Sequence, residues 1–249
     1  MKKLILVFLL MFTAASVGFA QIVITPKKTI YTRKGKEIPK EKQTFVVTYP
    51  LTSGTIPAAT GKKLANTISY WRVFETTLKE SQTDGWLSEL SYQVNYNKNG
   101  ILDIALTQDG SGAYPDRSTV NLVVDLKSGE PVKFADVFKA NSLVKFAEAV
   151  DAKLKIESKA IIQRIDKGEF GDENGKEAND SLKEQLGELS FTADTFNEFS
   201  VSDKGVTIIY DAGFPHVIQA AQPDGRYFFT WAQIRPLIKP DGLLAKFIR

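Results

Sequence analysis

The chain has 249 residues and no cysteine, and its 32 lysines and arginines against 29 acidic residues leave a formal net charge of +3. Without cysteine there is no disulfide and no thiol chemistry, so stability must come from apolar burial. The near balance of charge gives no electrostatic footprint for nucleic acid or for an anionic membrane, and we expect neither as a partner.

Residues 1–20 have the order of a secretory signal peptide: two lysines, an apolar run over 4–12, and small residues up to Ala20. The run is shorter than the roughly 20 residues that span a bilayer, so we expect cleavage between Ala20 and Gln21 rather than a membrane anchor. Removing the two lysines lowers the formal net charge from +3 to +1. We therefore expect an exported protein, periplasmic or extracellular, with no membrane span after the signal peptide is removed.

The segment 21–110 alternates strand and helix patterns. An extended segment at 22–24 and alternating apolar residues over 45–49 predict a hairpin that ends at Pro50. Apolar residues three or four positions apart predict one amphipathic helix over 57–78. The stripe on this helix is expected to pack into a core rather than to bind a ligand.

A second hairpin is predicted from strands over 90–96 and 102–106 around a turn at 97–100. The alternation within the first of these strands places Tyr92 and Tyr96 on the same half-exposed face. Aromatic rings on such a face either pack or bind, and periodicity alone leaves both open.

The stretch 110–138 organises the second part of the chain. A strand is predicted over 120–126, because apolar residues occupy every second position. Ser128 and Gly129 predict a turn, and the apolar segment 134–138 is expected to fold back under the strand.

The remaining pattern is a long amphipathic helix over 141–168, with Asn141 as its N-cap, followed by short strands. Three short strands are expected: one that ends at Val201, one over 206–210 and one over 227–231. A closing helix is expected from Ile234. Together these patterns indicate an α+β fold with mostly antiparallel sheets packed against two long amphipathic helices.

A polar loop over 168–180 raises the question of a metal. Its Asp172, Asn174 and Glu177 offer the oxygen ligands that calcium prefers. Their spacing departs from that of an EF-hand, so we expect a solvated loop and no metal site.

A pattern in the centre of the chain points to a family. It consists of Gly-Ala-Tyr-Pro at 112–115, Asp-Leu-Lys-Ser-Gly at 125–129 and Phe-Ala-Asp-Val-Phe at 134–138. It resembles the extracytoplasmic domain of lysozyme-sensing anti-sigma factors of the sigma-V type and the N-terminal region of peptidoglycan N-acetylglucosamine deacetylases. The resemblance implies an exported α+β module, with a deacetylase-associated part over 21–110 and an anti-sigma-like part over 111–249 packed as one unit.

The resemblance also implies binding at or near the cell wall. In the anti-sigma relatives the partner is lysozyme, and in the deacetylases the domain accompanies a separate catalytic domain. The chain shows no counterpart of that catalytic domain or of the membrane and cytoplasmic parts of the anti-sigma factors, so we expect binding rather than catalysis or signalling. Where the relatives tend to carry a tyrosine after the loop proline, this chain has His216.

Four loop residues are the candidate binding residues: Tyr114, Arg117, Phe214 and His216. Tyrosine and arginine are frequent anchors of protein interfaces, and aromatic faces also stack on sugars. The alternative is that Tyr114 and Phe214 plug the ends of the sheet. No cofactor is expected.

Catalysis has little support in the sequence. His216 is the only histidine, so metal sites with several imidazoles are excluded, and no G-x-S-x-G elbow supplies a serine nucleophile. An acid pair could serve a hydrolase, and the candidates are Asp103, Asp109, Asp116 and Asp125. Acids in strands and turns, however, usually cap turns or solvate edges.

Three hypotheses follow, in order of preference. The first is an exported, non-catalytic module that binds a protein such as lysozyme. The second is a module that binds the glycan of peptidoglycan. The third is a carboxylate-dependent hydrolase.

Overall fold

The computed structural model describes residues 22–34, 37–170 and 175–248. The expected signal peptide, residues 1–20, lies outside this part of the chain. The larger sheet holds, in spatial order, β1 (Ile22–Thr32), β2 (Thr44–Gly54), β3 (Leu87–Lys98), β4 (Ile101–Ser111), β5 (Pro115–Asp125) and β6 (Glu130–Pro131). The smaller sheet holds β7 (Glu198–Ser202), β8 (Gly205–Ile209) and β9 (Arg226–Thr230).

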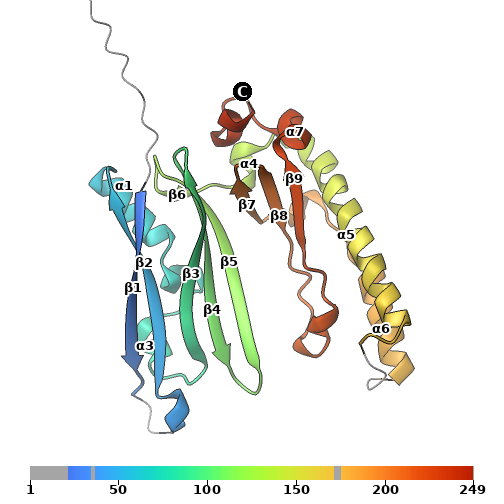
Figure 1. The fold of residues 1–249 in the computed structure, drawn as a ribbon, viewed down its shortest axis with the longest axis horizontal. Coiled ribbons are helices and arrows are strands. Elements are labelled where there is room, and N and C mark those ends of the chain that lie inside the picture. Colours follow the sequence, from blue (N-terminus) through green and yellow to red (C-terminus); the bar gives the residue numbers. More distant parts are fainter. Residues whose placement is uncertain (1–21, 35–36, 171–174, 249) are drawn as a thin grey trace, which may run out of the picture.

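Helices flank both sheets (Figure 1). The α-helices of the described residues are α1 (Ala58–Thr67), α2 (Tyr70–Val73), α3 (Leu78–Ser81), α4 (Phe134–Val137), α5 (Leu143–Asp166), α6 (Gly175–Glu188) and α7 (Trp231–Ile234). The first three pack on the larger sheet, α5 packs on the smaller sheet, and α6 packs on α5. All strand pairs are antiparallel except β2 with β3. The expected α+β fold is confirmed.

The single helix expected over 57–78 is wrong, because this segment forms three short helices. Ser69 takes an extended conformation with ψ of 123°, and Glu75 takes a positive φ of 50°, so the helix is interrupted twice. The apolar stripe is kept, since Leu64 and Ile68 are buried against the larger sheet. Spacing therefore predicted the buried face but not the breaks.

The long helix expected in the second half is confirmed as α5. Its buried residues keep helical spacing from Phe146 to Ile165. Gly168 follows its end with φ of 75°, the left-handed conformation that closes many helices. The N-cap is Ser142 rather than the expected Asn141.

The polar loop expected over 168–180 is partly helical. α6 begins at Gly175 and places Glu177 in its first turn, where an acid interacts favourably with the helix dipole. Two buried leucines then pack the helix into a cluster shared with α5. Asp172 and Asn174, the other residues considered for calcium, lie outside the described residues. Among the described helices, none is long and apolar enough to cross a membrane.

The first hairpin is longer than expected. β1 and β2 pair over 11 residues each, so the strand does not end at Pro50. Pro50 lies opposite Pro26, and β2 pairs with β3 only at Val46 and Val47. β1 is an edge strand and the pairing of β2 with β3 does not reach this level, and strands tolerate proline at such positions.

Two predicted turns are confirmed by their backbone angles. Asn99 and Gly100 connect β3 to β4 with φ of 55° and 70°, as a two-residue hairpin turn requires. Gly129, with φ of 76°, turns the chain between β5 and β6.

A bulge in β3 separates the two tyrosines that were expected on one face. The register shifts between Val94 and Tyr96, so Asn95 is an extra residue without a partner. Since strand side chains alternate, one extra residue moves all later side chains to the opposite face. Tyr92 therefore packs toward α1–α3, whereas Tyr96 is buried between the two sheets.

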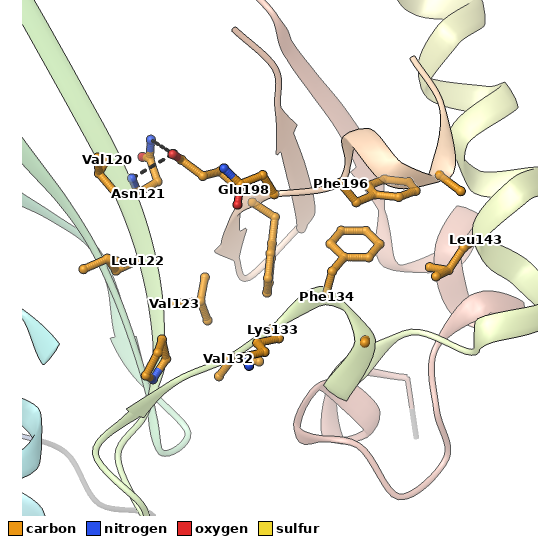
Figure 2. Close-up of a pocket in the computed structure, with 15 residues that line it drawn as sticks. Val120, Asn121, Leu122, Val123, Val132, Lys133, Phe134, Leu143, Phe196 and Glu198 are labelled. Atoms are coloured by element: carbon orange, nitrogen blue, oxygen red, sulfur yellow. Dashed lines mark hydrogen bonds between the residues drawn. The ribbon is translucent and has the colours of Figure 1, made fainter. Parts of the chain in front are cut away.

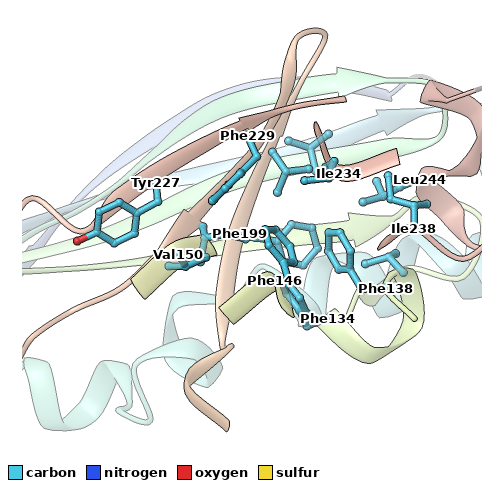
Figure 3. Close-up of a cluster of buried hydrophobic side chains, with 14 of the residues drawn as sticks. Phe134, Phe138, Phe146, Val150, Phe199, Tyr227, Phe229, Ile234, Ile238 and Leu244 are labelled. Carbon is cyan, nitrogen blue, oxygen red and sulfur yellow. The ribbon is translucent and has the colours of Figure 1, made fainter. Parts of the chain in front are cut away.

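Phenylalanines dominate the core that α4 and α5 form with the smaller sheet (Figure 3). Phe146 of α5 meets Phe229 of β9 edge to face, with 5.1 Å between ring centroids. Phe134 and Phe138 of α4 stack at 4.2 Å. Val123 of β5 joins the same cluster, so this core fixes α4, α5 and both sheets to one another.

The larger sheet contains strands from both parts of the expected division at residue 110. β4 and β5 lie on either side of that boundary and pair along their whole length. The chain leaves the larger sheet after β6 and then builds the other layer. The division into 21–110 and 111–249 stays a prediction.

Candidate binding site

A polar cleft lies between the two sheets, beside the phenylalanine core. Its floor is formed by cross-strand rows on β3, β4 and β5, namely Glu89, Asp109 and Arg117; Ser91, Thr107 and Thr119; and Gln93, Ala105 and Asn121. Arg226 of β9 and Gln219 face this floor. Two cavities of about 420 and 410 Å³ make up the space, and Arg117 lines both. We call it the inter-sheet cleft.

At the packed end of the cleft, the buried carboxylate of Asp103 joins the two sheets. It accepts hydrogen bonds from Ser200 Oγ and Val201 N, both at 2.6 Å, and from Asn95 Nδ2 at 3.0 Å. Burial raises the pKa of Asp103, although these hydrogen bonds and the nearby Arg226 act in the opposite direction. Because β4 supplies the carboxylate and β7 supplies two donors, this contact connects the layers.

A second carboxylate, that of Glu198 in β7, binds to β5. Glu198 accepts hydrogen bonds from the backbone N and the side-chain Nδ2 of Asn121, at 2.9 and 3.3 Å (Figure 2). Beside it lies a cavity of about 570 Å³, whose walls include the stacked rings of Phe134 and Phe196, 4.0 Å apart. This cavity is larger than either part of the cleft, but its walls are mostly apolar and its carboxylate is already paired. We therefore place the candidate site in the inter-sheet cleft.

Two arginines supply positive charge to the cleft. Arg117 Nε donates to Asp109 at 2.5 Å, and this hydrogen bond raises the pKa of Arg117. Arg226 is exposed and makes no hydrogen bond or ion pair with any residue that the structure describes. The cleft thus has one guanidinium held by a carboxylate and one that is available to a ligand.

An aromatic pair lies at the mouth of the cleft. Tyr114, in the turn between β4 and β5, stacks on His216 with ring centroids 5.0 Å apart and planes inclined by 23°. The side chain of Tyr114 is 63% exposed, and the neighbouring Val217 is 80% exposed. We call Tyr114, His216 and Val217 the rim. Single exposed apolar side chains are common on protein surfaces, but at the rim two of them, Tyr114 and Val217, lie at a stacked ring pair beside a cleft.

The structure brings three of the four candidate binding residues together. Tyr114 and His216 stack at the rim, and Arg117 lines the cleft close to them. Phe214 lies apart from them, because it packs in the apolar cluster shared by α5 and α6. A binding role for each of the four stays a prediction.

The acids considered for hydrolysis are mostly engaged in structural contacts. Asp103 is buried, Asp109 pairs across the strands, and Asp125 accepts a hydrogen bond from Lys127 N at 3.0 Å in a turn. Asp116 lines the cleft. Within the described ranges, no group of three or more His, Cys, Asp or Glu side chains is placed to hold a metal ion.

Sequence patterns missed most of the cleft. Ser91, Gln93 and Thr119 alternate with apolar neighbours, and this alternation predicts an ordinary solvated strand face. Arg226 faces them from a strand far along the chain. These residues meet only through the strand register and the position of the second sheet. Neither of the two can be predicted from the patterns of a single sequence.

Comparisons with known proteins concern the fold. None of the family models matches the chain, and neither does any curated protein. A member of the DUF3298 family from Bacteroides fragilis has a TM-score of 0.55 at 12% identity, over 92% of this chain and 98% of its own. A DUF3298 family protein from Pseudomonas aeruginosa has a TM-score of 0.51 at 14% identity, over 88% and 94%.

The chain has the fold of these two DUF3298 proteins. The match spans nearly the full length of both. At 12% and 14% identity the likeness concerns the fold alone. The function must therefore be argued from the site.

Proposed function

We propose that this protein is an exported, non-catalytic binding module of the bacterial cell envelope, and that its favoured ligand is a protein of the lysozyme type. The resemblance of the pattern over 112–138 to lysozyme-sensing anti-sigma factors supports this proposal. The signal-like order of residues 1–20 supports export.

The rim is the observation that carries the proposal. Tyr114 is held by its stacking on His216 and is still 63% exposed, so it can contact a partner with little loss of side-chain freedom. Val217 adds apolar surface beside it, and Arg117 adds charge at the edge of the cleft. Exposed aromatic anchors beside an arginine are typical of the residues that dominate protein interfaces.

Calorimetric titration with lysozyme tests the proposal. The chain without residues 1–20 is expected to bind, and Tyr114→Ala is expected to weaken binding by about tenfold or more, because the removed ring is a central anchor. Arg117→Ala is expected to weaken binding less, since this arginine keeps a carboxylate partner in the free protein.

Val144→Ala provides the matched control. Val144 lies on α5 and is 63% exposed, as Tyr114 is, so the substitution removes similar exposure away from the rim. We expect its affinity to equal that of the wild type. Equal affinity for lysozyme in the wild type and the three variants would show that the rim is not the interface. If the wild type gave no heat of binding, lysozyme would be excluded as the ligand.

A further inference from the structure

The walls of the inter-sheet cleft offer hydrogen-bonding groups and no apolar pocket. The cavity of about 410 Å³ is lined by hydroxyls, amides and two arginines, and its apolar contributions come from Ala105, the two threonine methyl groups and Tyr92. Sites for peptide side chains normally include an apolar pocket that anchors one of them. A ligand whose own surface consists largely of hydroxyl and amide groups fits these walls better.

Several of these groups have unused hydrogen-bonding capacity. Asn95 and Asn121 both line the cleft and each donate through Nδ2 to a carboxylate, so their Oδ1 atoms are not used in these hydrogen bonds. The side chain of Gln93 makes no hydrogen bond with any described residue. The cleft therefore presents both acceptors and donors along one strip of the sheet, as a polyhydroxylated chain requires.

The charges are divided between the two cavities of the cleft: the acids Asp109 and Asp116 line the cavity of about 420 Å³, whereas the charged residues that line the cavity of about 410 Å³ are Arg117 and Arg226. Arg226 makes no ion pair with a described residue, and the outer nitrogens of Arg117 are not used in its bond through Nε to Asp109. A guanidinium binds a carboxylate through paired hydrogen bonds, and that contact is stronger than one to a neutral hydroxyl. The favoured ligand therefore carries carboxylates as well as hydroxyls.

We propose that the inter-sheet cleft binds a carboxylate-bearing glycan strand of the cell wall, with Arg226 holding a carboxylate and Gln93, Asn95 and Asn121 holding hydroxyl and amide groups. The proposal rests on the proposed function in one respect, namely that the protein is exported to the envelope. The exposed ring of Tyr114 at the mouth offers a face on which a sugar can stack.

Titration with two matched oligosaccharides tests this site. One is the peptide-free tetrasaccharide of peptidoglycan, which carries lactyl carboxylates, and the other is chitotetraose, which has the same backbone without them. The wild type is expected to prefer the carboxylate-bearing chain. Arg226→Gln is expected to weaken binding of that chain by about tenfold and to remove the preference, because it removes the charged hydrogen bonds.

Arg235→Gln is the matched control, because Arg235 is exposed and lies outside the cleft lining. It is expected to keep the wild-type affinity and preference. Equal affinity of the wild type for both oligosaccharides, or a preference that survives in Arg226→Gln, would overturn the proposal. Tighter binding of an acidic peptide than of the tetrasaccharide would also overturn it and assign the cleft to a protein segment.

Lysozyme titrations of the same variants separate this proposal from the previous one. If the protein binds the carboxylate-bearing glycan but not lysozyme, the proposed glycan site stands and the proposed protein ligand is wrong. If the wild type binds lysozyme, Tyr114→Ala does not, and neither binds the glycan, the proposed interface at the rim stands and the proposed glycan site is wrong.

Discussion

The inner face of the larger sheet has two halves, built on the same three strands, that differ in chemistry. Where β7 and α4 cover it, the face carries Tyr96, Ile101 and Val123, all at most 5% exposed, around the buried Asp103. Beyond that level the same face carries hydroxyls, amides and charges, and most of these side chains are at least partly exposed. We call these the covered half and the open half.

The difference shows how the protein keeps a stable layer contact next to an accessible polar surface. Apolar burial and a fully hydrogen-bonded carboxylate hold the covered half. The open half takes no part in the phenylalanine core, so its side chains can vary in chemistry without loss of packing. Stability and binding are therefore expected to respond to different residues.

The largest expected effect comes from Asp103 in the covered half. Asp103→Ala leaves the buried N–H of Val201 and the hydroxyl of Ser200 without their acceptor. We expect the free energy of unfolding to fall by about 3 kcal/mol, measured by urea denaturation. Asp116→Ala, which removes an exposed acid from the cleft lining outside the covered half, should change it by less than about 0.5 kcal/mol. Similar losses in both variants would contradict the distinction between the halves.

Two opposite substitutions on β5 test the same difference between the halves, with a smaller expected change in the free energy of unfolding. Val123→Thr places a hydroxyl at a position that is 3% exposed, and we expect a loss of about 1.5 kcal/mol. Thr119→Val, two rows away in the open half, loses only an exposed hydrogen bond to Thr107 at 3.0 Å and should stay within about 0.5 kcal/mol. The distinction would fail if Thr119→Val were the more damaging change.

The smallest expected effect is a pH dependence that also originates at Asp103. Burial raises the pKa of Asp103, so between its unfolded and folded pKa values the folded state binds more protons than the unfolded state. The contribution of Asp103 to stability is thus fully present below its unfolded pKa, about 3.9, and is lost as pH rises through the folded pKa. Urea denaturation over a pH series should show wild type losing stability relative to Asp103→Asn as pH rises. A difference that stays constant with pH would contradict this assignment.

Much of the fold could be predicted because its strongest signals are local. The apolar alternation of β5, the helical spacing of α5 and the turn at Asn99 and Gly100 each depend on neighbouring residues only. The breaks between α1, α2 and α3 could not be predicted, since neither a glycine nor a proline marks the positive φ of Glu75. The bulge at Asn95 likewise has no glycine to mark it in the sequence.

The site could be predicted less well than the fold. Tyr114 and His216 were identified as exposed loop aromatics, but their stacking requires two segments about 100 residues apart to meet. Phe214 has the same residue chemistry and packs elsewhere. The open half was missed because a polar strand face that lines a cleft has the same sequence pattern as one that faces bulk water.

Hydrogen exchange of the backbone amides, with and without lysozyme, tests the central claim most directly. If the rim and the edge of the open half form the interface, lysozyme should slow exchange in the segments around Tyr114–Thr119 and His216–Ala221 and leave β1 and α5 unchanged. Slowed exchange confined to β1 or α5, with both rim segments unaffected, would contradict the account.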